Sequence, residues 1–201
     1  MLLQGAGQAL CVWQQRTEAI CFLDVGQGDG ILIRSPDGRN IVIDGGSTSQ
    51  SKCGTYTLLP ALRSQGMTEI DCWFVTHTDE DHISGLKELL LQGKLTQIKV
   101  RTVVFSAYVF QDAAWAELEA VIRAAGITIV WMREGDVIGD DTFTLTCLHP
   151  TAEYRAKDKN AASLALAYHS DTFDMLFTGD MDADAVADMD IQQDYDCIKL
   201  P

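Results

Sequence analysis

Positive charge is scarce in this sequence, and the scarcity narrows the functions that the chain can serve. The 201 residues include 15 lysines and arginines against 29 aspartates and glutamates, for a formal net charge of −14. No lysine or arginine occurs between Asn160 and Ile198. Proteins that bind nucleic acid by neutralising phosphates usually present a basic surface. A phosphate-bearing substrate would therefore need help from bound cations.

Long apolar runs and paired cysteines are also absent. No run approaches the roughly 20 residues of a membrane-spanning helix, and the first ten residues lack the basic start and apolar core of a signal peptide. The cysteines lie far apart without a Cys-x-x-Cys pair, which indicates free thiols. We expect residues 1–201 to form a single domain, in which residues 1–18 are a leading strand or tail.

The order of the apolar segments predicts a mixed α/β (α+β) fold with two sheets. Short apolar segments between turn residues predict strands over 19–25, 30–34, 40–44, 70–76, 100–106, 127–132, 142–148, 163–169 and 173–178. Helical spacing of apolar residues predicts helices that end near Gly66, follow Ile83, include Trp115 to Ala125 and run from about Asp182 to Met189. The strands are too numerous and too often consecutive for one parallel sheet.

Two histidines and three carboxylates lie within residues 77–82, directly after the predicted strand 70–76. Imidazole nitrogen and carboxylate oxygen are good ligands for divalent transition metals, and a loop at the end of a strand leaves the backbone free to aim them. As an alternative, Asp79 or Asp81 could simply cap the following helix. A cap needs one carboxylate and explains neither His77 nor His82, so the pattern favours a metal site.

Three glycines, at positions 26, 28 and 30, follow the first predicted strand. Their Gly-x-Gly-x-Gly spacing differs from that of a dinucleotide-binding loop, and a turn rather than a helix follows. We therefore expect no nucleotide cofactor. The glycines instead predict a tight chain crossing that holds Asp29 near the metal-binding edge.

Several segments together resemble one known domain. Residues 76–83 (THTDEDHI) resemble the HxHxDH signature of the metallo-β-lactamase fold, in the HxDxDH form found in the hydrolase domain of ComEC, the membrane protein of DNA uptake in competent bacteria. Four further segments are similar to that domain in the same order: FLDVGQGDGILI at 22–33, IVIDGG at 41–46, NAASL at 160–164 and LFTGDM at 176–181. The resemblance extends from about Ala19 to the last residue.

The resemblance implies a metallo-β-lactamase αββα four-layer sandwich with two metal ions along one sheet edge. The ligands that it implies are, in chain order, His77, Asp79, Asp81, His82 and Asp180. The first two would serve one ion, the next two the other, and the last would bridge them. It also makes Asp81 and Asp180 the residues on which catalysis depends, with Asp29 and Asp44 placed just outside the ligands.

The chain departs from the family pattern at two places. Where many relatives have a histidine for the first ion, this chain has Asn160, which is either a weak ligand or a hydrogen-bond partner of one; His149 could substitute. A His-His-Gly-Ser motif would follow a segment like residues 197–201, where this sequence stops. The resemblance thus implies that a sixth ligand and the final layers lie after Pro201, and we expect partial metal occupancy.

The expected activity is that of a metal-dependent hydrolase. Two divalent ions activate water and polarise a phosphoryl or acyl oxygen, so no serine or cysteine nucleophile is required. Asp79 stands where a histidine is usual and supplies a harder oxygen ligand to the first site. The first site could therefore bind manganese as well as zinc. The resemblance implies a phosphodiesterase or nuclease that acts on DNA during uptake, and we expect this DNA to be single-stranded.

Two alternatives stay open: a hydrolase of small esters or lactones on the same fold, and a non-catalytic module that has lost its metal.

The expected partners and location depend on the natural context of the chain. As part of a ComEC-like protein, the domain would be tethered to a membrane-embedded portion and face outward; as a free-standing chain, it would be cytoplasmic.

Overall fold

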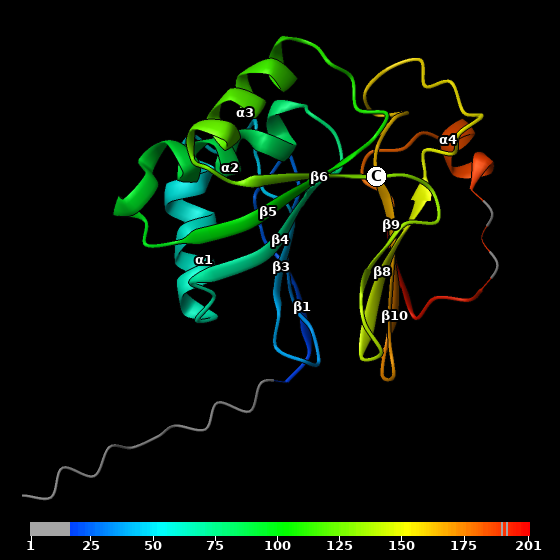
Figure 1. The fold of residues 1–201 in the computed structure, drawn as a ribbon, viewed down its shortest axis with the longest axis horizontal. Helices are drawn as coiled ribbons and strands as arrows, with labels where there is room; N and C mark the ends of the chain where they lie inside the picture. Colours follow the sequence, from blue (N-terminus) through cyan, green and yellow to red (C-terminus); the bar gives the residue numbers. More distant parts are fainter. Residues whose placement is uncertain (1–16, 190, 192) are drawn as a thin grey trace, which may run out of the picture.

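Two β-sheets face each other at the centre of the fold, and helices cover their outer faces (Figure 1). The computed structural model describes residues 17–189, 191 and 193–201. The leading strand or tail expected over residues 1–18 therefore lies almost entirely outside the described residues. The predicted mixed α/β fold with four αββα layers is confirmed.

The first sheet has six strands in the order β1-β2-β3-β4-β5-β6. The first three strands pair antiparallel, and β3 to β6 run parallel. Their bounds are β1 Ala19–Phe22, β2 Gly30–Arg34, β3 Asn40–Asp44, β4 Glu69–Val75, β5 Lys99–Ser106 and β6 Thr128–Met132. Because β3 and β4 are parallel, their carboxyl ends meet at the same edge, where ligand sites of α/β sheets usually lie.

The second sheet has five strands in the order β11-β10-β9-β8-β7. Its neighbours pair antiparallel except β10 and β11, which run parallel. The bounds are β7 Val137–Gly139, β8 Phe143–His149, β9 Ala165–Ser170, β10 Asp174–Phe177 and β11 Cys197–Lys199. The carboxyl end of β10 leads to Asp180, on the same side of the fold as the ends of β3 and β4.

The helices form the two outer layers. The first sheet is covered by α1 (Leu59–Ser64), which follows the π-helical turn η1 (Gly54–Leu58), by α2 (Glu80–Gln92), which the 3-10 turn η2 (Gly93–Leu95) follows, and by α3 (Ala113–Ala124). The second sheet is covered by α4 (Ala183–Asp188). Along β4 the side chains alternate between two cores: Trp73 packs toward the helices and Phe74 toward the other sheet.

Most predicted elements are present, with small shifts at their ends. The strands predicted over 30–34 and 40–44 have the predicted bounds, whereas β1 ends at Phe22 because the chain then turns into the glycine segment. The patterns do not predict β7 and β11, which have three residues each. The five described cysteines are free thiols, as expected, and Cys11 lies outside the described residues.

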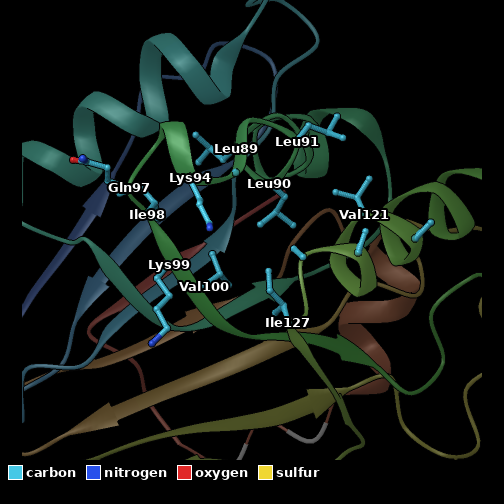
Figure 2. Close-up of a pocket in the computed structure, with 14 residues that line it drawn as sticks. Leu89, Leu90, Leu91, Lys94, Gln97, Ile98, Lys99, Val100, Val121 and Ile127 are labelled. Carbon is cyan, nitrogen blue, oxygen red and sulfur yellow. The ribbon is translucent and has the colours of Figure 1, made fainter.

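No helix in the described part of the chain has the length and apolar character needed to cross a membrane. A cavity of about 920 Å³ lies where the carboxyl ends of α2 and α3 meet the start of β5 (Figure 2). Leu90, Val100, Val121 and Ile127 line it. The 13 residues of α2 span about 20 Å, and this cavity lies at the end of the helix opposite the histidine motif. It is therefore separate from the candidate metal centre.

Glycines allow the chain crossing that fixes the start of α2. A Cβ on Gly28 would lie 2.4 Å from the carbonyl oxygen of Asp81, and one on Gly46 would lie 2.5 Å from its carbonyl carbon. Between these glycines, the Asp29 amide donates to the Asp81 carbonyl at 3.2 Å, and the Gly46 amide donates to the Asp29 carbonyl at 3.0 Å. The crossing predicted from the glycine spacing is confirmed.

Gly46→Ala should test the importance of this crossing. The added methyl group has to displace the backbone of Asp81 and His82, so we expect the free energy of unfolding to fall by roughly 2 kcal/mol. We also expect the affinity for Zn²⁺ to fall. Chemical denaturation and calorimetric titration measure the two effects.

Gly66→Ala is the matched control. Gly66 has a φ of 67° but nothing within 4 Å of an added Cβ, so only backbone strain of about 1 kcal/mol is expected, with no effect on metal affinity. Equal metal affinities in the two variants would contradict a role for the crossing in positioning the site.

Candidate metal centre

Three side chains from separate elements converge at the shared edge of the two sheets. His77 follows β4, His82 lies in the first turn of α2, and Asp180 follows β10. Their candidate ligand atoms all lie within 4.8 Å of one another. His82 Nε2 is 3.2 Å from Asp180 Oδ2, and the two imidazole rings lie 4.0 Å apart between centroids. Both histidines are buried, whereas Asp180 is partly exposed.

The buried carboxylate of Asp44 orients His82. Asp44 Oδ1 accepts from the Thr76 amide at 2.8 Å, and Oδ2 accepts from the Thr76 hydroxyl at 2.7 Å. The same Oδ2 lies 2.9 Å from His82 Nδ1, which must therefore donate a hydrogen to it. His82 Nε2 is left facing Asp180.

The hydrogen bonds of Thr76 also determine which ring nitrogen of His77 carries the hydrogen. The Thr76 hydroxyl gives its only hydrogen to Asp44, so toward His77 Nδ1, at 3.1 Å, it can only accept. The Ser163 hydroxyl lies 3.3 Å from the same nitrogen. With the hydrogen on Nδ1, Nε2 of a neutral His77 carries the lone pair.

His77 Nε2 is buried and has no hydrogen-bond partner among the described residues. An unpaired buried polar atom is costly unless something binds it. A lone pair on a buried imidazole nitrogen, beside a second imidazole and a carboxylate, matches the donors that divalent transition metals prefer. The residues present therefore fit a divalent metal ion, with His77, His82 and Asp180 as the candidate ligands.

The charges differ sharply between the two histidines. Burial lowers the pKa of His77, and the neighbouring charge of His82 lowers it further. Burial also lowers the pKa of His82, but the charge of Asp44 and the hydrogen bonds to Asp180 and Asp44 outweigh burial and raise it to about 10. The hydrogen bond from His82 in turn holds the pKa of Asp180 at about 2. A metal ion that binds His82 must therefore displace a proton.

Asp79 and Asp81 lie beside this group without belonging to it. Asp79 Oδ2 is 3.7 Å from His77 Nε2, and its Oδ1 accepts from Lys159 at 2.8 Å. Although Asp79 occupies the N-cap position of α2, its side chain makes no capping hydrogen bond, so capping does not explain its presence. Asp81 lines a cavity of about 290 Å³ together with Asp180 and His82.

Asp29 enters the same cavity from the glycine segment. Its Oδ2 lies 3.9 Å from His82 Nδ1, and Asp29, Asp44 and His82 form a second group of potential ligand atoms within 4.8 Å. Burial raises the pKa of Asp29, and the charge of Asp44 adds to this effect. Both aspartates therefore lie beside His82, outside the group of His77, His82 and Asp180.

Asn160 and His149 lie outside both groups of potential ligands. Asn160 is exposed, and its backbone carbonyl accepts from the Ser163 amide at 3.0 Å. His149 is buried at the end of β8, where its Nδ1 donates to the Ser163 carbonyl at 3.0 Å. The structure gives neither side chain a contact with His77, His82 or Asp180.

Sequence reasoning missed four side chains that shape the site: Thr76, Ser163, Lys159 and Lys199. Ser163 links two ligands, because its hydroxyl accepts from the Asp180 amide at 3.3 Å and contacts His77. Lys199 contacts Asp29 and Asp180. A signal for the lysines was available, because they flank the long segment without positive charge.

Comparison with known proteins identifies the family. The model of the metallo-beta-lactamase superfamily matches residues 23–152, and the chain belongs to this superfamily. It is 30% identical over 174 residues to ComE operon protein 3 of Bacillus subtilis (strain 168), which covers 80% of this chain and 22% of that protein. The chain thus spans less than a quarter of the length of this curated relative.

A solved structure shares the fold. The metallo-beta-lactamase fold protein YhfI from Bacillus subtilis superposes with a TM-score of 0.51 at 14% sequence identity, covering 76% of this chain and 55% of that one. Zn²⁺-bound PqqB from Methylobacterium extorquens has a TM-score of 0.48 at 11% identity, covering 75% and 52%.

Asp180→Asn should weaken metal binding. The change removes the carboxylate charge from the group while keeping its shape, so we expect affinity for Zn²⁺ or Mn²⁺ to fall roughly tenfold or more. Calorimetric titration of the metal-free protein measures the change. Asp184→Asn, an exposed acid four residues away, is the control and should bind as the unmodified chain does. Unchanged affinity in Asp180→Asn would remove Asp180 from the ligand set.

The raised pKa of His82 predicts a pH dependence of stability. In the metal-free protein the pKa of His82 is about 10, against 6.5 for an ordinary histidine, so the folded state holds a proton that the unfolded state releases. The corresponding stability is complete below pH 6.5 and is lost as the pH rises toward 10. Denaturation at a series of pH values should show this decline.

Asp44→Asn separates His82 from other groups that titrate in this range. Asparagine tolerates the left-handed conformation of Asp44, whose φ is 55°, but has no charge to stabilise protonated His82. The decline above pH 6.5 should therefore become shallower in this variant. Identical slopes in the two proteins would show that Asp44 does not control His82.

Proposed function

We propose that this chain is the hydrolytic part of a metal-dependent phosphodiesterase that cleaves DNA, single-stranded DNA above all, during competence-related uptake. The observation that carries the proposal is the convergence of Asp180 with two buried imidazoles, one of which presents an unpaired Nε2. The 30% identity to ComE operon protein 3, of whose length this chain covers 22%, supports a place in a larger, competence-related protein.

In this proposal His77, His82 and Asp180 hold the ion, and Asp79 lies beside His77. The cavity that Asp29 and Asp81 line is the place for a second ion. A bound divalent ion supplies Lewis-acid activation of water and of a phosphoryl oxygen. Zinc and manganese both suit the mixed imidazole and carboxylate donors.

Three neighbouring side chains hold the donor atoms of the metal-binding group in place. Asp44 holds the hydrogen of His82 on Nδ1 directly, and Thr76 does the same for His77. Ser163 fixes the backbone of Asp180 relative to His77. The centre is thereby ordered by hydrogen bonds before any substrate binds, which lowers the cost of organising the reaction.

Cleavage of DNA is the direct test. Single-stranded DNA should be degraded by the chain, and by a version extended past Pro201 in the natural gene, in the presence of Mn²⁺ or Zn²⁺, and a chelator should stop the reaction. Asp81→Ala and Asp180→Ala should lower activity at least a hundredfold, because Asp180 is a ligand of the proposed ion and Asp81 lines the cavity beside it. Asp184→Ala should leave the rate unchanged. Gel electrophoresis of a labelled oligonucleotide measures it.

The outcomes distinguish the alternatives. An extended chain that leaves DNA intact but hydrolyses a p-nitrophenyl ester or a lactone would replace the phosphodiesterase by a small-substrate hydrolase on the same fold. Protein purified without added metal that takes up no Zn²⁺ or Mn²⁺ on titration would instead indicate a non-catalytic module.

A further inference from the structure

A lysine side chain occupies the acidic cavity beside the metal-binding group. Lys199 Nζ forms an ion pair with Asp29 Oδ2 and lies 3.6 Å from Asp180 Oδ1. It also donates to the Gly179 carbonyl at 3.0 Å. The Lys199 side chain is only 12% exposed, so this ammonium is a largely buried cation within the cavity.

The position of the ammonium follows from the strand pairing. β11 runs parallel to β10 with Lys199 opposite Phe177, and the Thr178 hydroxyl donates to the Lys199 carbonyl at 2.9 Å. The same strand β10 leads to Asp180 three residues later. The register that places the carboxylate therefore also places the lysine beside it.

The cavity has the composition of a second cation site. Asp29, Asp81, His82 and Asp180 line it together with Lys199. The three carboxylates repel one another strongly unless positive charge lies between them, because like charges a few ångströms apart in a half-buried site interact strongly. Lys199 provides a positive charge that remains when a metal ion displaces the proton of His82.

We propose that Lys199 is a tethered cation that neutralises this cavity and competes with a second divalent ion. A single ion binds readily at His77, His82 and Asp180, whereas a second ion binds beside Asp29 and Asp81 only when the ammonium moves away. Lys199 thus sets the number of ions that the chain holds at a given metal concentration. This inference builds on the metal centre of the proposed function but needs no DNA cleavage.

Metal stoichiometry tests the inference. Lys199→Met keeps the length of the side chain and removes its charge. Calorimetric titration with Zn²⁺, checked by elemental analysis after dialysis, should give one tightly bound ion for the unmodified chain. In Lys199→Met the second ion should bind about tenfold more tightly or better, because a like charge has left the cavity.

Lys199→Arg and Lys99→Met are the matched controls. Arginine restores the charge and should return the second ion to weak binding, and Lys99→Met removes an exposed lysine of β5 and should change nothing. Denaturation curves show whether each variant is folded. A second ion that binds Lys199→Met as weakly as the unmodified chain, or more weakly, would overturn the inference.

The metal titration and the DNA-cleavage assay can fail independently of each other. If Lys199→Met gains a second ion and the extended chain still leaves DNA intact, the tethered cation stands and the phosphodiesterase proposal fails. If DNA is cleaved but the second-ion affinity does not respond to residue 199, the reverse holds.

Discussion

The hydrogen bonds that Asp44 accepts are the interaction on which the rest of the site depends. This one buried carboxylate joins the end of β3 to the loop after β4 and to the first turn of α2, through Thr76 and His82. It accepts three hydrogen bonds, so its charge is well compensated despite burial. Because the Thr76 hydroxyl donates its hydrogen to Asp44, it can only accept one from His77 Nδ1. The lone pair of His77 is therefore on Nε2. One carboxylate thus determines which nitrogen each histidine offers to a metal.

The second constraint is an excess of negative charge in a chain of net charge −14. Several carboxylates lie at the edge where the sheets meet. The two lysines that flank the segment without positive charge, Lys159 and Lys199, both contact carboxylates at this edge. Lys159 contacts Asp79 and Asp112 at 2.8 Å each, and Lys199 contacts Asp29. The centre is therefore balanced by internal cations as well as by any metal. This balance explains how so acidic an edge can fold. It also explains how the binding of a second ion can stay weak.

Apolar patterns predicted two sheets and most strands because the patterns are regular, whereas the four-layer arrangement was implied by the family resemblance. The histidine motif could be recognised as a metal site from its donors, but its union with Asp180 came only through family resemblance, since the two segments lie about a hundred residues apart. The hydrogen bonds through Thr76 depend on the register of β3 against β4, which no local pattern reveals. The gap in positive charge singles out Lys199, but its place beside Asp180 depends on the pairing of β11, which has only three residues and little apolar patterning.

Crystals of the chain loaded with Zn²⁺ offer the most direct test of the central claim, through the anomalous scattering of zinc. The account predicts a strong anomalous peak in contact with His77 Nε2, His82 Nε2 and the Asp180 carboxylate, with Asp44 still bound to His82 Nδ1. A peak held by other residues, or a histidine that binds the ion through Nδ1, would contradict it.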